Sequence, residues 1–98
     1  MADTLRFLLR EGGRDVPFAI HKPRATVGRS NGNDIQVVDL QASRVHCAIE
    51  RIDGTVRLTD LGSHNGTFVN GTRVLSVDLV AGDVIRVGAA EIAYRDAA

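Results

Sequence analysis

The stretch of sequence that decides the fold class is HCAIERIDGTVRLTD, residues 46–60. The runs on either side of its centre, 46–52 and 56–60, alternate apolar and polar residues, which is typical of strands that bury one face. Between them stands Asp53-Gly54, a dipeptide favoured in two-residue hairpin turns because both positions adopt positive φ readily. The stretch therefore predicts two antiparallel strands joined by a tight turn.

Similar short runs continue in both directions from this hairpin, and none of them has the period of an amphipathic helix. Asn70-Gly71 indicates a second tight turn. Many short strands at regular spacing are typical of a sandwich or barrel. We predict an all-β fold, a two-sheet antiparallel sandwich of about ten or eleven short strands with binding loops at one end. The further strands are expected at 5–10, 16–20, 24–28, 35–38, 67–69, 73–75, 83–87 and 91–95.

The composition fits one small domain over residues 1–98 and argues against several partners. Twelve basic and 12 acidic residues give a net charge of +0, with 4% aromatic residues and no tryptophan. Nucleic-acid binders usually show a basic face or stacking aromatics, so we expect no nucleic-acid partner. No run has transmembrane length, and the N-terminus lacks signal-peptide order. We expect no membrane partner, a monomer and, because Cys47 is the single cysteine, a reducing cytoplasmic setting.

Three predicted loops hold the same kinds of residue: 28–30 (GRS), 43–46 (SRVH) and 63–67 (SHNGT). Loops distant in sequence can converge at one end of a sandwich. Arg29 and Arg44 offer planar guanidinium donors and Ser43 offers a hydroxyl, a set that suits the oxygens of a phosphate monoester. The amide of Asn65 carries a donor and an acceptor, which suits a peptide main chain. We therefore expect an anion site next to a peptide-binding group.

The same residues invite a catalytic interpretation, which the sequence does not favour. Ser43 and His46 could form a nucleophile and base, but their spacing is only sequential and no oxyanion loop is evident. His46 and Cys47 are strand neighbours that face opposite ways, and His21 lies in a separate loop without ligand spacing. We predict no enzymatic activity, no metal and no cofactor.

The motifs Gly28-Arg29, Ser43-x-x-His46 and Asn65-Gly66 occur in this order. The last of them lies within the longer stretch DLGSHNGTFVNG at 60–71, which is followed by LxxGDxIxxG at 79–88. In combination they resemble the signature of forkhead-associated (FHA) domains, and the resemblance covers essentially the whole chain. It implies a β-sandwich that binds phosphothreonine peptides through loops at one end, in Ser/Thr kinase signalling. The implied partner is a threonine-phosphorylated protein or peptide, which could also belong to the same chain.

The resemblance also implies individual roles. Arg29 and Ser43 would contact the phosphate directly, with Arg44 as a flanking donor, and Asn65 would bond the peptide main chain. The residues that it makes structural parts of the loops are Gly28, His46, Gly66, Asn70 and Gly71.

His64 departs from the family pattern, which often has threonine before the asparagine. We expect His64 to contact the phosphate either through its backbone N–H or through its ring when that is protonated. A second hypothesis is a scaffold that self-associates through a sheet face, suggested by the apolar residues Val77, Leu79 and Val80.

Overall fold

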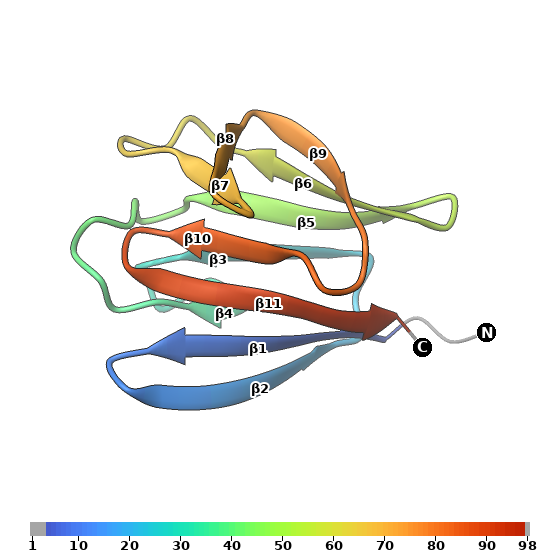
Figure 1. Cartoon of the computed structure of the whole chain (residues 1–98), viewed down its shortest axis with the longest axis horizontal. Helices are drawn as coiled ribbons and strands as arrows, with labels where there is room; N and C mark the ends of the chain where they lie inside the picture. The colour runs from blue at the N-terminus through green and yellow to red at the C-terminus, as the bar shows by residue number, and fades with distance from the viewer. Residues whose placement is uncertain (1–3, 98) are drawn as a thin grey trace.

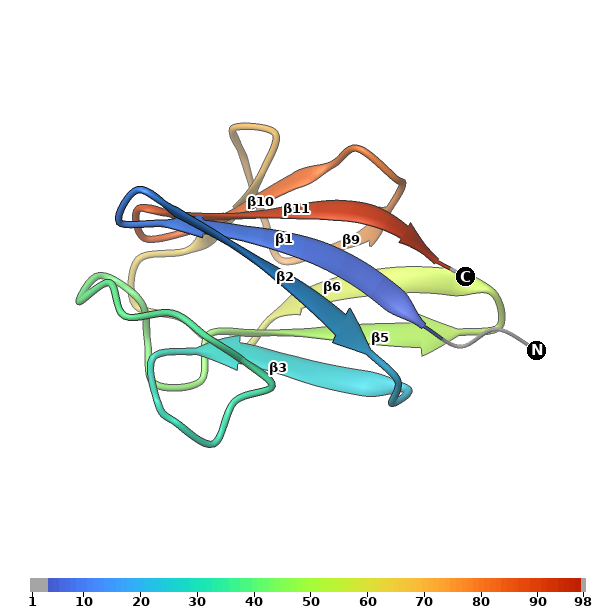
Figure 2. The ribbon, with the colours of Figure 1, turned by 90° about the horizontal axis from the view of Figure 1, so that it is seen from below.

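The computed structural model describes residues 4–97 and contains two β-sheets packed face to face (Figures 1 and 2). This confirms the predicted sandwich and its strand-rich pattern. The eleven strands of the described residues are β1 (Leu5–Glu11), β2 (Arg14–Ile20), β3 (Arg24–Gly28), β4 (Ile35–Gln36), β5 (Cys47–Ile52), β6 (Thr55–Asp60), β7 (Thr67–Val69), β8 (Thr72–Val74), β9 (Ser76–Leu79), β10 (Val84–Val87) and β11 (Ala90–Ala97).

The hairpin predicted at residues 46–60 is formed by β5 and β6, which pair antiparallel from Cys47↔Asp60 to Ile52↔Thr55. Asp53 and Gly54 have φ angles of 49° and 82°, so both turn residues adopt the left-handed conformation that a twisted hairpin requires. The alternation along both strands places Ile49 and Leu58 in the interior with no exposed surface. The turn residues and the alternating burial along both strands thus confirm the predicted hairpin.

One sheet has the order β2-β1-β11-β10-β7-β8 and the other β4-β3-β5-β6-β9. The two ends of the described chain meet in the first sheet, where Leu5 pairs with Ala97. All pairs are antiparallel except β3 and β4, which run parallel through Val27↔Ile35 and Gly28↔Gln36. The chain reaches this parallel position through the loop 29–34, one of the loops that form the candidate site.

The sequence missed strand β9. It predicted a strand at residues 73–75 and an apolar surface farther along, whereas Leu75 is 78% exposed between β8 and β9. The chain passes there from one sheet to the other, because β8 pairs with β7 and β9 pairs with β6. Leu79 is buried and Val77 packs against the core, so of the three apolar residues proposed for self-association only Val80 is exposed.

The loops β3–β4, β4–β5 and β6–β7 lie at one end of the sandwich together with the β1–β2 and β10–β11 turns, away from the N-terminal end of β1 and the C-terminal end of β11 (Figures 1 and 2). Within residues 4–97 the chain contains no helix of the length and hydropathy needed to span a membrane. The binding loops expected at one end of the sandwich are therefore present as a group of neighbouring connections.

We expect Leu58→Ala to lower the free energy of unfolding by about 2–5 kcal/mol, because it removes contacts and leaves a cavity between the sheets. Leu75→Ala is the matched control, since the same truncation at a 78% exposed position should change stability by less than about 0.5 kcal/mol. Urea unfolding monitored by circular dichroism measures the free energy of unfolding of both variants. Similar losses for the two variants would contradict the core assigned to Leu58.

Candidate functional site

The loops after β3 and before β5 are paired by their backbones. Arg29 N donates to Ser43 O at 2.9 Å, and Ser30 N donates to Arg44 O at 3.1 Å. Asn33 reinforces the pair, because its side-chain Nδ2 donates to both Ser30 O and Arg44 O at 2.7 Å. Residues separated by 14 positions in sequence thus form one continuous surface.

Gly28 is required by this close approach of the two loops. A Cβ atom built on Gly28 would lie 2.2 Å from the carbonyl oxygen of Arg44, and 2.9 Å from Nδ2 of Asn33. Because the nearest atom belongs to the backbone, a side chain at this position could be accommodated only by separating the loops. The reason for glycine here is space, since its φ is not in the left-handed region.

His46 joins the β4–β5 loop to the β6–β7 loop from inside the protein. Its side chain has no exposed surface, and Nδ1 accepts a hydrogen bond from Ser43 N at 3.0 Å. Nδ1 is therefore unprotonated, so the proton of the neutral imidazole lies on Nε2 and is donated to Gly66 O at 2.8 Å. With both ring nitrogens engaged, His46 holds the two loops at a fixed separation.

The carboxylate of Asp60 organises the β6–β7 loop. Oδ1 accepts hydrogen bonds from the hydroxyls of Ser63 and Thr67, and Oδ2 accepts from the backbone N–H groups of Gly62 and Ser63 at 3.1 Å each. Burial alone raises the pKa of the Asp60 carboxyl, but the hydrogen bonds outweigh it and lower that pKa below its usual 3.8. The loop is thus built around an ionised group.

Gly66 occupies the position where this loop enters β7. Its φ is +91°, and a Cβ atom there would lie 2.7 Å from Nε of Arg73. Its N–H donates to Ser63 Oγ at 3.0 Å, while its carbonyl oxygen accepts the hydrogen bond from Nε2 of His46. The backbone conformation therefore favours glycine, whereas the exposed Arg73 side chain is flexible and can move aside.

Together these loops enclose an open hollow of about 440 Å³. All five residues expected from the sequence to contact phosphate or peptide line it. The lining consists of Arg29, Leu40, Gln41, Ala42, Ser43, Arg44, Val45, His64 and Asn65.

Hydrogen bonds inside the protein leave several donors of this hollow available. Arg29 uses Nε to hold Ala42 O at 3.1 Å, a bond that leaves its two terminal amino groups for a ligand. The guanidinium of Arg44 forms no hydrogen bond or ion pair within residues 4–97, and the residue is exposed. The hollow therefore has two cationic groups that can meet an anion bidentately.

Ser43 and His64 contact each other at the edge of the hollow. The backbone N–H of His64 donates to Ser43 Oγ at 3.0 Å. Of the two routes expected for a contact between His64 and phosphate, the backbone N–H is thus engaged within the protein, and the exposed ring remains. Because Ser43 Oγ accepts this bond, its hydroxyl proton is directed elsewhere and can be donated to a ligand.

Asn65 is exposed and held by one of its amide protons, since Nδ2 donates to Gln41 O at 2.8 Å. The second N–H and the Oδ1 acceptor stay available. This orientation gives the side chain one donor and one acceptor toward an extended ligand.

Asn70 and Gly71 lie away from the hollow, in the turn between β7 and β8, with φ angles of 51° and 85°. Asn70 also ties this turn to the β9–β10 connection: Nδ2 donates to Asp83 Oδ1 at 2.9 Å, and Oδ1 accepts from Val84 N at 3.0 Å. The Asn70 side chain therefore links the β7–β8 turn to the β9–β10 connection, in addition to the positive φ that this residue adopts in the turn.

The sequence interpretation missed Asn33, Asp60 and Glu11 as supports of the site. The Glu11 carboxylate, from the β1–β2 end, accepts hydrogen bonds from the backbone N–H groups of Val38 and Asp39 at 2.9–3.0 Å. These residues bond backbone groups of distant segments, which leaves no local pattern. Of these three residues, only Asp60 could have been found from the local sequence. An Asp placed three residues before Ser63 is typical of a side chain that caps a turn.

No group of three or more His, Cys, Asp or Glu residues within residues 4–97 has the arrangement of a metal site. Cys47 is fully buried, and burial together with the charge of Asp60 raises the pKa of its thiol to about 12. The thiol therefore stays protonated and is a packing group rather than a nucleophile or ligand.

Comparisons with known proteins point to one family. Residues 25–88 match the family model of the FHA domain. The chain is 35% identical, over 98% of its length, to an ABC transporter ATP-binding/permease protein of Mycobacterium tuberculosis, and 38% identical over 72% to an oxoglutarate dehydrogenase inhibitor of Corynebacterium diphtheriae. It spans 11% of the first relative and 50% of the second.

Solved structures give the same family. One, of an FHA domain with phosphothreonine-dependent interactions, superimposes with a TM-score of 0.85 at 33% identity, covering 95% of this chain and 96% of the other. Another, of the FhaA FHA domain in complex with the intracellular domain of a second protein, has a TM-score of 0.85 at 32% identity, covering 93% and 99%.

Gly28→Ala should lower the free energy of unfolding by about 1–3 kcal/mol, because the new methyl group forces the Arg44 carbonyl away. Gly32→Ala, in the same β3–β4 loop, is the matched control: a Cβ there meets nothing within 4 Å. It should change stability by less than about 0.5 kcal/mol. Denaturant unfolding of both variants tests this, and equal effects would show that the close approach is not limiting.

Asp60 should make folding sensitive to acid. Its pKa is lowered in the folded protein, so its stabilising contribution is complete above the unfolded value, near 3.8, and is lost as pH falls through the folded value. We expect Asp60→Asn to be less stable at neutral pH and to lose less stability than the parent between about pH 4 and pH 2. Unfolding free energies measured across this range provide the test. Parallel profiles would exclude Asp60 as a contributor.

Proposed function

Because the chain belongs to the FHA domain family, we propose that it is a phosphothreonine-dependent protein-interaction module in Ser/Thr kinase signalling. The observation that carries the proposal is the hollow in which unused donors of Arg29, Ser43 and Arg44 meet beside Asn65. A phosphate monoester brings nearly two negative charges and three strong acceptor oxygens to such a set. The ligand is a threonine-phosphorylated segment of a partner or of the same protein.

In this proposal Arg29 forms paired hydrogen bonds to phosphate oxygens through its terminal amino groups, and the Ser43 hydroxyl donates to a further oxygen. Arg44 flanks the phosphate as a second cation. The ring of His64, when protonated, contributes an additional donor. Asn65 holds the peptide main chain with its remaining N–H and its Oδ1.

The internal bonds of the loops support such binding at low ordering cost. Gly28, His46 and Gly66 act as structural positions, together with Asn70 and Gly71 in the neighbouring turn. A preformed surface saves the entropy of arranging the receptor, but a short peptide still loses its own freedom. We therefore expect micromolar dissociation constants for isolated peptides.

We propose that the module is non-catalytic and works without a cofactor. Nδ1 of His46 accepts a hydrogen bond from the backbone N–H of Ser43, and Nε2 donates one to Gly66 O. Neither ring nitrogen is therefore placed to take the proton of the Ser43 hydroxyl. A serine without a base lacks the activation that nucleophilic catalysis requires.

We further propose that residues 1–98 act as one binding domain, monomeric in isolation and placed in the cytoplasm. The balanced charge of +0 and the single, buried cysteine support a protein ligand in a reducing compartment.

Isothermal calorimetry with a degenerate phosphothreonine peptide library should show binding, and the unphosphorylated library should show none. Arg29→Ala should weaken binding by at least about tenfold, since charge-assisted bonds contribute about 1.5–3 kcal/mol. Arg24→Ala is the matched control, because it removes the same charge from an exposed position on β3, outside the hollow.

Equal binding of both libraries would overturn the proposal. So would equal losses for Arg29→Ala and Arg24→Ala, which would indicate a general charge effect. Thermal unfolding of both variants separates a binding defect from a folding defect.

A further inference from the structure

Three of the four asparagines in the chain are followed by glycine, at 31–32, 65–66 and 70–71. Asparagine is a thermolabile residue, and glycine is the neighbour that leaves it most reactive. Because glycine has no side chain, its backbone nitrogen can approach the side-chain carbonyl carbon of the preceding asparagine without hindrance. The three pairs are chemically alike, so their surroundings in the fold decide which of them can react.

The reaction is a deamidation that consumes only water. The glycine nitrogen loses its proton and attacks Cγ of the asparagine, the Cγ–Nδ2 bond breaks, and the leaving nitrogen takes up a proton and departs as ammonia. Water then hydrolyses the resulting succinimide ring at either of its two carbonyl carbons. One opening gives aspartate, and the other gives isoaspartate, whose main chain is longer by one carbon. Both products replace a neutral amide by a carboxylate that is ionised at neutral pH.

The pair Asn31-Gly32 is unprotected in the fold. Both residues are exposed in the β3–β4 loop, and a Cβ atom built on Gly32 would meet nothing within 4 Å. Neither the Asn31 side chain nor the Gly32 N–H makes a hydrogen bond within residues 4–97. The backbone hydrogen bond that closes the turn around them, from Asn33 N to Ser30 O, is longer than usual at 3.3 Å. Solvent therefore reaches both reacting groups, and the turn is weakly held.

The pair Asn65-Gly66 is protected at both reacting groups. The Gly66 N–H donates to Ser63 Oγ at 3.0 Å, and Gly66 is buried. The Asn65 side chain is held by a bond of its own, from Nδ2 to Gln41 O at 2.8 Å. The nitrogen that would attack is thus engaged and shielded from hydroxide, so this pair should react only when the loop opens.

The pair Asn70-Gly71 is exposed, but the asparagine side chain is fixed. Its Nδ2 donates to Asp83 Oδ1 at 2.9 Å, and its Oδ1 accepts from Val84 N at 3.0 Å. Attack by the Gly71 nitrogen requires the asparagine side chain to turn, which would break both bonds. Exposure by itself therefore does not make an Asn-Gly pair reactive.

We propose that Asn31 is a site of spontaneous deamidation in the folded protein, and that the reaction impairs the phosphate-binding loops. The effect on binding rests on the proposed function, whereas the reaction itself does not. Asn31 stands two residues after Arg29 and directly after Ser30, whose N–H bonds the Arg44 carbonyl. Arg29 and Arg44 both line the hollow, so a new carboxylate beside them opposes the charge of an incoming phosphate.

Isoaspartate should have the larger effect, because it changes the backbone of the loop. Its additional main-chain carbon falls between Ser30 and Asn33. Nδ2 of Asn33 donates to Ser30 O and to Arg44 O at 2.7 Å each, and these bonds join the β3–β4 and β4–β5 loops. A longer turn displaces Asn33 from Ser30, so the two bonds cannot both keep their geometry. The aspartate product keeps the backbone and adds only an exposed charge that salt screens.

Incubation of the folded domain at mildly alkaline pH, followed by tryptic digestion and mass spectrometry, tests the site. Trypsin releases Asn31 within the peptide 30–44 and the other two pairs within the peptide 58–73, and fragment ions separate Asn31 from Asn33. Deamidation at Asn31 should be at least about tenfold faster than at the protected pairs. It should accelerate as pH rises, because the attacking nitrogen is deprotonated.

The same incubation in guanidinium chloride should bring the three rates within about threefold of one another, since only the fold distinguishes the pairs. Gly32→Ala is the matched control in the folded domain, because its methyl group hinders the attacking nitrogen but meets nothing in the fold. It should slow deamidation of Asn31 at least about tenfold and leave the rates at Asn65 and Asn70 unchanged.

Calorimetry with the phosphothreonine peptide library measures the effect on binding. Asn31→Asp, which reproduces the aspartate product, should bind about two- to fivefold more weakly at low salt, and the loss should shrink as salt rises. In the aged domain, the number of high-affinity sites should fall in proportion to the isoaspartate content, because that form should bind at least about tenfold more weakly. Gly32→Ala aged alongside should keep its affinity.

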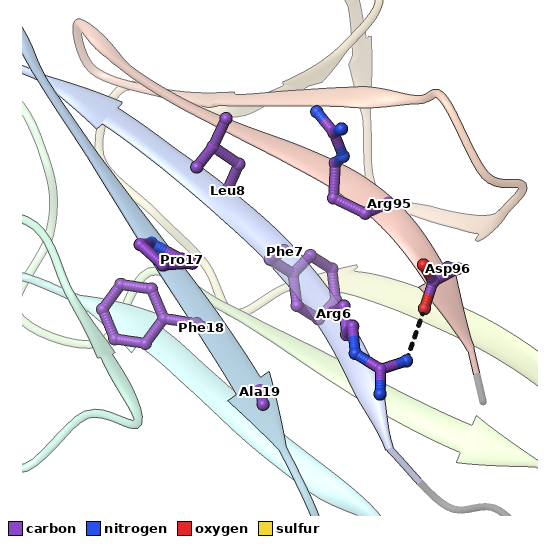
Figure 3. Close-up of a pocket in the computed structure, with 8 residues that line it drawn as sticks. All are labelled: Arg6, Phe7, Leu8, Pro17, Phe18, Ala19, Arg95 and Asp96. Atoms are coloured by element: carbon purple, nitrogen blue, oxygen red, sulfur yellow. Dashed lines mark hydrogen bonds and ion pairs between the residues drawn. The ribbon is translucent and has the colours of Figure 1, made fainter.

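NMR of the aged, isotope-labelled domain locates the change. Amide shifts should change in 29–34 and 43–45, the two loops that Asn33 joins. The reference surface is the depression of about 550 Å³ over β1, β2 and β11, whose lining residues, among them Leu8 and Ala19, lie outside both loops (Figure 3). Their amides should keep their shifts. Equal changes at the reference surface would contradict a local effect and assign the lost affinity to general instability.

An unmodified Asn31, or equal rates at the three pairs in the folded domain, would rule out the proposed site. Full affinity of the isoaspartate-containing domain, with the fresh domain binding normally, would rule out its effect on the loops. If the fresh domain itself does not bind the phosphorylated library, the proposed function fails, and mass spectrometry still decides whether Asn31 is the modification site.

Discussion

The hydrogen bonds of the buried His46 ring are the constraint on which the candidate site depends. One ring nitrogen accepts from the backbone of Ser43 and the other donates to the backbone of Gly66, so a single rigid group sets the distance between two loops. The ring has no exposed surface, and a buried polar group that loses one partner carries an unsatisfied nitrogen. This cost couples the two loops: neither can move without breaking a bond inside the core.

Two further supports act on the same loops by different means. Gly28 contributes by lacking a side chain, which allows the backbones of the β3–β4 and β4–β5 loops to bond directly. Asp60 contributes a carboxylate whose oxygens collect the N–H and hydroxyl donors of the β6–β7 loop. The space at Gly28, the charge of Asp60 and the tautomer of His46 thus each fix one part of the hollow. The donors of Arg29, Ser43 and Asn65 are held by hydrogen bonds before any ligand arrives.

The loop hollow is polar, and its affinity would come from directed bonds to an anion. Recognition of this kind depends on a chemical modification of the ligand, because a phosphate adds the negative charge and the acceptor oxygens that the donors of the hollow can bind.

The sequence by itself determined the strand pattern, the Asp53-Gly54 hairpin and the composition of the loops, because alternation and turn residues act over a few neighbouring positions. Family resemblance then assigned roles to Arg29, Ser43 and Asn65, which remain a proposal. Only the tertiary structure decided that His64 gives its backbone N–H to Ser43, that Leu79 is buried, and that Asn33 and Glu11 hold the loops. Those contacts join residues far apart in the chain, and which distant donor meets which acceptor is fixed by sheet packing, which leaves no periodic signal in the sequence.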